Sequence, residues 1–142
     1  MDVESTRLTL EYGALALTDG SVPWEAQLHP GLDLVSDDIP LVRTIRGGLV
    51  IRSRTYGEWG KYIVVKQEDG LYCIYAHLAS LAVSEGETVA EDTVIGVMGS
   101  SGYATAAHLH IELQENYYDP YSHVDVAYYL GIKNVVGYVG YL

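Results

Sequence analysis

The sequence contains a single cysteine, no phenylalanine and few basic residues. One cysteine cannot form an internal disulfide, and a chain of 142 residues is long enough to bury a core without one. Cys73 lies in the apolar run LYCIYAH, which predicts a small buried side chain and not a reactive thiol. We therefore expect one domain over residues 1–142, and cysteine usage does not identify its compartment.

Basic side chains are outnumbered, with 8 Lys and Arg against 19 Asp and Glu, so the formal net charge is −11. This charge opposes attraction to phosphate backbones and to anionic membranes, and we expect neither nucleic acid nor membrane as a partner. No apolar run approaches the ~20 residues of a membrane-spanning helix. The opening MDVESTRLTLEYG has neither the basic nor the apolar segment of a signal peptide.

Helical patterns are nearly absent, and short β-branched or aromatic runs occupy most of the chain. These runs are RLTLEY, IPLVRTI, GLVIRSR, KYIVVKQ, LYCIYAH, TVIGVM and LHIELQ. QEDG predicts a hairpin turn with Asp69-Gly70 in its tight positions. One segment, DPYSHVDVAYYLGI, predicts a short helix that Pro120 or Ser122 opens and Gly131 closes. The pattern predicts an all-β fold, an antiparallel sandwich or open barrel with at most one short C-terminal helix.

Two histidines stand one residue apart in the strand-like segment AAHLHIEL. Side chains alternate along a strand, so His108 and His110 should point to one face and Leu109, Ile111 and Leu113 to the other. The pair is either a half-exposed polar patch on a sheet or part of a metal or catalytic site. The second interpretation requires partners elsewhere in the chain.

Candidate partners occur in two other segments. LHPGLDLV supplies His29 and Asp33, and Pro30-Gly31 between them predicts a turn that could aim both side chains at one point. IYAHLASL is expected to end a strand at His77. Two histidines and one carboxylate, with one position left to water, are the ligands typical of catalytic zinc. The two remaining histidines could then serve as general base and oxyanion stabiliser.

Together, HPGLD, YAHL and SSGYATAAHLHIEL are similar to the three signature segments of the M23 metallopeptidases, the lysostaphin or LytM-type endopeptidases that cut peptidoglycan peptides. The resemblance covers residues 27 to 114, and the flanks 1–26 and 115–142 stay unassigned. It implies a β-sandwich or open barrel of the duplicated hybrid motif type. It also implies that His29, Asp33 and His110 bind one zinc ion per chain, and that His77 and His108 flank the attacking water and the developing oxyanion.

The chain departs from the family pattern at three places. Gln67 stands where many members carry a histidine, and Ala106-Ala107 replaces a usual Gly-Pro before the histidine pair. Some members carry a tyrosine upstream of the first ligand that stabilises the transition state, where VPWEAQ offers Trp24 and Glu25. None of these departures removes one of the five functional side chains.

Two other functional classes share features with this sequence. VSEGETVAEDTVIGVM resembles the sandwich of biotinyl and lipoyl carrier domains, but Val97-Met98-Gly99 offers no lysine to modify, which excludes a carrier. A catalytically inactive M23-like domain that binds or regulates cell-wall hydrolases typically lacks one or more of the five side chains, and all five are present. We therefore expect a zinc endopeptidase that hydrolyses peptidoglycan stem peptides or cross-bridges.

The expected place of action is the cell wall, outside the cell, in the periplasm or on a phage virion. An acidic chain is not drawn by charge to anionic wall polymers. We therefore expect a separate targeting module or a phage tail assembly to deliver it.

Overall fold

The computed structural model describes residues 6–10, 15–17, 26–28, 30–36, 40–102, 104, 106–119, 121–134 and 136–138. The strands in these ranges are β1 (Thr6–Leu10), β2 (Leu15–Leu17), β3 (Ala26–Leu28), β4 (Gly31–Ser36), β5 (Leu41–Arg43), β6 (Gly48–Tyr56), β7 (Gly60–Gln67), β8 (Tyr72–Leu81), β9 (Thr88–Val89), β10 (Val94–Met98), β11 (Leu109–Gln114), β12 (His123–Val124) and β13 (Gly137–Tyr138). They are accompanied by a 3-10 turn, η2 (Gly57–Trp59), and a short helix, α1 (Val126–Leu130). Neither of these described helical segments has the length and apolarity that crossing a membrane requires.

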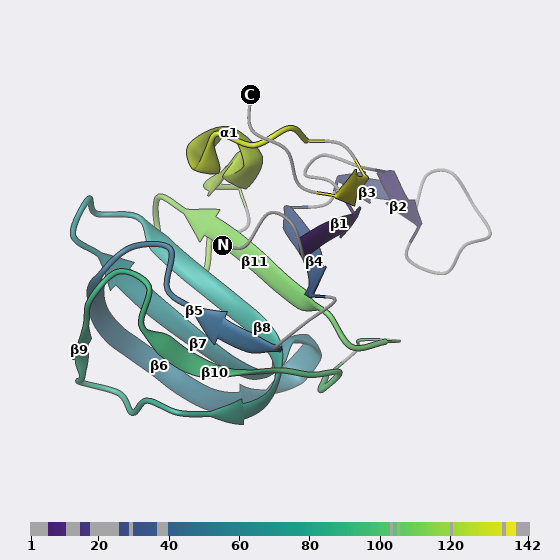
Figure 1. Cartoon of the computed structure of the whole chain (residues 1–142). Helices are drawn as coiled ribbons and strands as arrows, with labels where there is room; N and C mark the ends of the chain where they lie inside the picture. The colour runs from purple at the N-terminus through teal and green to yellow at the C-terminus, as the bar shows by residue number, and fades with distance from the viewer. Residues whose placement is uncertain are drawn as a thin grey trace.

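The described strands form one large antiparallel sheet and a separate β2–β3 pair. The order in the large sheet is β13-β1-β4-β11-β8-β7-β6-β9, with β12 beside β11 and β10 joining β5 to β8. Figure 1 shows β6, β7 and β8 side by side in a curved sheet, and β5 and β10 crossing one of its faces. The fold is therefore all-β, antiparallel and open, as predicted.

The main core lies between the curved sheet and the β5–β10 layer. It takes Ile63 and Val65 from β7, Cys73 and Tyr75 from β8, and Ile95 from β10, each completely buried. The odd-numbered leucine and isoleucine side chains of β11 join the same core, which confirms the face predicted for Leu109, Ile111 and Leu113.

A second cluster covers the opposite face of the same strands. Tyr62, Val64, Ile74 and Ala76 form it, with Trp59 and Tyr117 among the partly buried side chains packed against it. Residues directly paired across antiparallel strands point to the same face. The even-numbered polar residues of β11, which pair with Ile74 and Ala76, therefore lie on this second face.

The predicted turn and helix are both present. The β7–β8 hairpin closes through Gly70, which has φ +88°, and the Gln67 N–H donates to the Leu71 carbonyl at 2.8 Å. Helix α1 ends at Gly131 in the left-handed conformation, as expected. It starts later than predicted, since Asp125 caps it by accepting a hydrogen bond from the Tyr128 N–H at 3.1 Å.

Candidate functional site

Three neighbouring strands bring the candidate residues to one row on the second face. Asp33 in β4 pairs with His110 in β11, which pairs in turn with Ala76 in β8. Asp33 Oδ1 lies 2.6 Å from His110 Nδ1, and Asp33 Oδ2 lies 3.6 Å from His108 Nε2. Strand register thus places a carboxylate against both histidines of the AAHLHIEL segment, although 75 and 77 residues separate them in the chain.

His77 enters the row through an irregularity in β8. The prediction that a strand ends at His77 is wrong, because β8 continues to Leu81. His77 instead has φ +64°, and the pairing of β7 with β8 shifts register between Lys61 and Ile63. A non-glycine residue in this left-handed conformation is uncommon and often occurs at functional sites. The bulge places the His77 ring 4.8 Å from that of His108 and 5.9 Å from that of His110, between centroids.

Backbone carbonyls hold two of the three rings by Nδ1. His77 Nδ1 lies 2.8 Å from the Ser101 carbonyl oxygen, and His108 Nδ1 lies 2.9 Å from that of Ala106. A carbonyl can only accept, so Nδ1 carries the proton in both rings. The neutral form of each ring then has its lone pair on Nε2, the atom required of a general base or a proton relay.

His110 is held by its other ring nitrogen, Nε2. Its Nε2 lies 2.7 Å from Glu112 Oε1, and a carboxylate accepts, so Nε2–H donates there and Nδ1 is directed at Asp33. A carboxylate behind a histidine in this way is the usual arrangement for fixing the ring of a metal ligand. His110 therefore differs from His77 and His108 in the nitrogen that it presents to the cluster.

Glu112 is itself supported along β11 and from β4. Gln114 Nε2 donates to Glu112 Oε2 at 3.2 Å, and the Tyr118 N–H donates to Gln114 Oε1 at 2.8 Å. Gly31 pairs opposite Glu112, and a Cβ there would lie 2.9 Å from Glu112 Cγ and 2.1 Å from the Ile111 carbonyl oxygen. The glycine of HPGLD is thus required for the close approach of β4 to β11.

The surroundings change the pKa of two of the histidines in opposite directions. Burial is the main cause that lowers the pKa of His77, which keeps its ring neutral near pH 7. Burial also lowers the pKa of His110, but the hydrogen bonds to Asp33 and Glu112 outweigh it and raise that pKa to about 9. His110 therefore donates from both nitrogens to its two carboxylate neighbours.

The two expected ligands among the described residues, Asp33 and His110, fit the zinc ion that the family resemblance implies. Asp33 and His110 Nδ1 supply a carboxylate oxygen and an imidazole nitrogen, both common zinc ligands. Their 2.6 Å separation is that of a hydrogen bond, so a metal bound here would replace the proton on Nδ1. The third expected ligand, His29, lies outside the described residues, as do Trp24 and Glu25. Within the described part of the chain, no three ligating side chains converge on one point.

Comparison with known proteins identifies the family. The model of the family described as Peptidase family M23 matches residues 27–121. The chain belongs to peptidase family M23. This M23 chain is 33% identical over 90 residues to the DD-carboxypeptidase/endopeptidase Mpg of Neisseria meningitidis, and 32% identical over 85 residues to the peptidoglycan DD-endopeptidase ShyA of Vibrio cholerae. Those matches cover 63% and 60% of this chain but only 21% and 20% of the two relatives.

A solved structure supports the same assignment. The M23 chain superposes on the catalytic domain of the antimicrobial peptidase lysostaphin from Staphylococcus simulans with a TM-score of 0.74 at 27% identity. The match covers 90% of this chain and 94% of the lysostaphin domain. The M23 chain thus has the fold of a peptidase catalytic domain and spans about a fifth of the length of its first curated relatives.

Sequence reasoning missed Glu112, although its signal was present. The alternation that places His108 and His110 on one face of the strand continues to Glu112 and Gln114. Both side chains are buried, at 5% and 3% exposure. A charged residue in a strand is ordinarily assigned to solvent, and the hydrogen bonds from His110 and Gln114 explain why this one is buried.

Proposed function

We propose that this chain is a zinc-dependent endopeptidase that hydrolyses peptide bonds in bacterial peptidoglycan. The observation that carries the proposal is the difference in ring orientation around Asp33. His110 presents Nδ1 with a carboxylate behind it, which suits a metal ligand, whereas His77 and His108 present Nε2, which suits proton transfer. Membership of family M23 and the endopeptidase relatives support the same reaction class.

In this proposal His29, Asp33 and His110 hold the zinc ion. When bound, zinc supplies a Lewis acid that polarises the scissile carbonyl and makes water more acidic. Nε2 of one free histidine takes a proton from the water that attacks the carbonyl carbon, and the proton passes to the leaving amine. The other histidine, when protonated, donates a hydrogen bond to the oxyanion. The bulge at His77 and the carbonyl bonds to Nδ1 keep both Nε2 atoms in place before substrate binds.

We further propose that the chain acts at the cell wall as one module of a larger protein or assembly, a targeting protein or a phage tail. The curated relatives support this, since they are about five times as long as the matched region. The net charge of −11 supports it as well, because such a domain is repelled by anionic wall polymers.

Digestion of purified peptidoglycans of several cross-link types, with mass spectrometry of the products, tests the reaction directly. We expect zinc-loaded protein to release fragments with a new amino terminus at one type of peptide bond. Removal of the metal with a chelator should abolish release, and added zinc should restore it. Metal content is measured on the same samples, with one zinc per chain expected after loading.

Two outcomes contradict the proposal in different ways. Absence of bound metal after zinc loading at neutral pH would exclude the zinc site. One bound zinc per chain without cleavage of any wall type would favour the inactive M23-like domain that binds or regulates hydrolases.

A further inference from the structure

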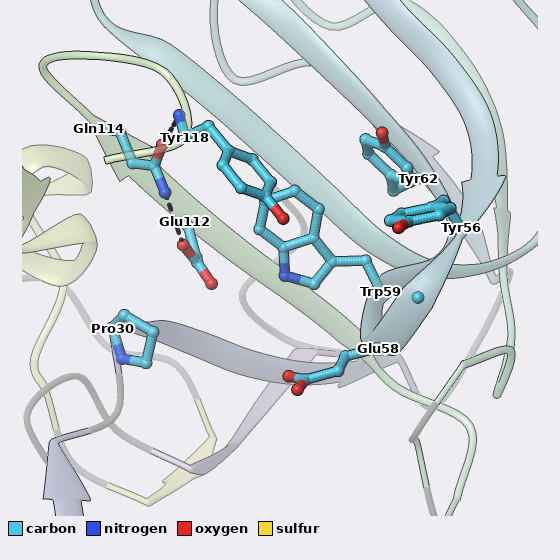
Figure 2. Close-up of a pocket in the computed structure, with 9 residues that line it drawn as sticks. Pro30, Tyr56, Glu58, Trp59, Tyr62, Glu112, Gln114 and Tyr118 are labelled. Atoms are coloured by element: carbon cyan, nitrogen blue, oxygen red, sulfur yellow. Dashed lines mark hydrogen bonds between the residues drawn. The ribbon is translucent and has the colours of Figure 1, made fainter. Parts of the chain in front are cut away.

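A cavity of about 450 Å³ lies beside the candidate site on the second face of the sheet. The tip of the β6–β7 hairpin and the turn after β11 line it, together with Pro30 and Glu112 (Figure 2). Glu112 belongs to both places, since it lines the cavity and accepts the Nε2 proton of His110. The part of the cavity at Glu112 therefore lies one side chain away from the proposed metal ligand.

Aromatic rings set at steep angles form one wall of the cavity. The Trp59 and Tyr118 centroids lie 6.0 Å apart with their planes at 77°, and those of Trp59 and Tyr62 lie 5.2 Å apart at 59°. Figure 2 shows the Trp59 indole at the centre of this wall, with Tyr118 on one side and Tyr62 on the other. Rings at steep angles make a corner that can contact a methylene chain and a compact cation from several sides.

Carboxylates are the charged groups at this wall. Glu58 and Glu112 line the cavity, and no lysine or arginine is among the described residues around it. Both Glu112 oxygens are occupied, by His110 and Gln114. Glu58 is exposed at the rim, and its side chain makes no hydrogen bond or ion pair with a described residue. Glu58 is thus available to an incoming cation.

We infer that this cavity is a specificity pocket for a substrate side chain that ends in a free ammonium group, as lysine and other diamino acids do. The inference rests on the proposed peptidase function. The methylene stem lies against Trp59 and Tyr118, and the ammonium group reaches Glu58. The attraction of a cation to aromatic faces adds to the charge pairing.

The cleavage test uses synthetic peptides that span the bond identified by mass spectrometry. At each position flanking that bond, lysine is compared with Nε-acetyllysine and norleucine, which keep the stem and remove the charge. At one position we expect lysine to be favoured about tenfold or more in kcat/KM. Glu58→Gln should reduce that preference to about threefold or less, and Tyr118→Ala should weaken it. Glu68→Gln, which removes an exposed carboxylate on the β7–β8 turn, should leave it unchanged.

A binding measurement separates this inference from the proposed function. Calorimetric titration of the zinc-loaded His108→Ala variant with the same peptides, or with lysine-containing tripeptides if no bond is cleaved, does not depend on turnover. Tighter binding of the lysine peptide, lost with Glu58→Gln, supports the pocket. Equal binding of all three peptides overturns it while cleavage by the native chain still supports the peptidase. Stronger competition by an N-acetylglucosamine disaccharide than by the lysine peptide would assign the pocket to sugar and would also overturn it.

Discussion

Two polar clusters lie at different places on the sheet and are built in different ways. The histidine cluster consists of Asp33, His77, His108 and His110. The tyrosine cluster, at the turn that joins β7 to β8, consists of Arg46, Gln67, Asp69 and Tyr129. In the tyrosine cluster, Tyr129 Oη donates to Asp69 and accepts from Arg46 Nε at 2.8 Å, so that acid, phenol and cation satisfy one another.

The histidine cluster is held mainly from outside. Backbone carbonyls and Glu112 bind the far side of each ring and leave one nitrogen of each directed inward. Asp33 and His110 also pair inside the histidine cluster, but backbone carbonyls hold His77 and His108 by Nδ1, so that Nε2 is the nitrogen each ring presents to a ligand or a proton. The difference between the two clusters therefore lies in the direction of the hydrogen bonds and not in the number of polar groups.

The largest expected effect comes from removing histidines one at a time. His110→Ala should lose both bound zinc and cleavage, because a proposed ligand is gone. His108→Ala and His77→Ala should keep zinc while cleavage falls by about 10² to 10⁴, the usual cost of losing one proton-transfer group. Zinc stoichiometry and peptidoglycan cleavage are measured in parallel on the three variants. Loss of zinc from His108→Ala equal to that from His110→Ala would contradict the division of roles.

A smaller effect is expected behind the ligand. Glu112→Leu removes the acceptor for His110 Nε2–H, and zinc affinity should fall by about 10- to 100-fold. Glu112→Gln keeps a carbonyl oxygen as acceptor and should retain most of the affinity. Competition with a chromophoric chelator gives both dissociation constants without reference to activity. Unchanged affinity of Glu112→Leu would show that the Glu112 contact does not orient the ring.

Gly31 tests how closely the histidine cluster is packed. Gly31→Ala should lower the free energy of unfolding by about 1 to 3 kcal/mol, the range for a group forced into a packed site. Truncation of its neighbour in Glu112→Ala should not rescue it, because the new Cβ would still lie 2.1 Å from the Ile111 carbonyl oxygen. Urea unfolding of the single and double variants measures this, and full recovery in the double variant would place the clash at Glu112 alone.

The smallest effects belong to the tyrosine cluster. Burial raises the pKa of Asp69, but hydrogen bonds from Tyr129, Gln67 and the Leu71 N–H outweigh it and lower that pKa below its usual value. A depressed pKa in the folded state gives stability above the unfolded value of about 3.9 that is lost as the pH falls through the folded value. Asp69→Asn should therefore flatten the acid limb of the stability curve.

Tyr129→Phe tests whether the tyrosine cluster contributes to zinc binding or cleavage. It removes one hydroxyl and should cost about 1 kcal/mol of stability, with zinc binding and cleavage unchanged. Stability against pH is followed by thermal or urea unfolding between pH 3 and 7 (about the range where carboxylates titrate). A loss of cleavage in Tyr129→Phe at a temperature where the chain stays folded would mean that the two clusters are coupled.

Much of the fold was predictable because its strands alternate clearly. The alternation in LHIELQ placed the apolar residues of β11 in the core, and QEDG gave the hairpin turn. The helix end was set by Gly131, whose left-handed conformation suits glycine. Its start was misplaced because Ser122 and Asp125 both suit an N-cap, and only the structure shows that Asp125 accepts the capping bond.

The candidate site was less predictable than the fold, since it depends on contacts between distant strands. Motif spacing pointed to Asp33, His77, His108 and His110, and the structure brings these four together. Neither the ring orientations nor the role of Glu112 is encoded locally. Each depends on which carbonyl or carboxylate a neighbouring segment supplies, such as Ser101 for His77.

The bulge at His77 also decides which strands β8 pairs with. Before it, even-numbered residues of β8 face the second cluster, as Ile74 and Ala76 do. After it the alternation is reversed, and Leu78 points into the main core. From Leu78 onward β8 pairs with β10, while its first half pairs with β11.

One extra residue therefore transfers β8 from one layer of the fold to the other. A strand without this extra residue would direct the His77 imidazole to the other face. The later half of the strand would then be out of phase with β10. The backbone irregularity that directs the His77 side chain is therefore also the point at which β8 changes its partner from β11 to β10.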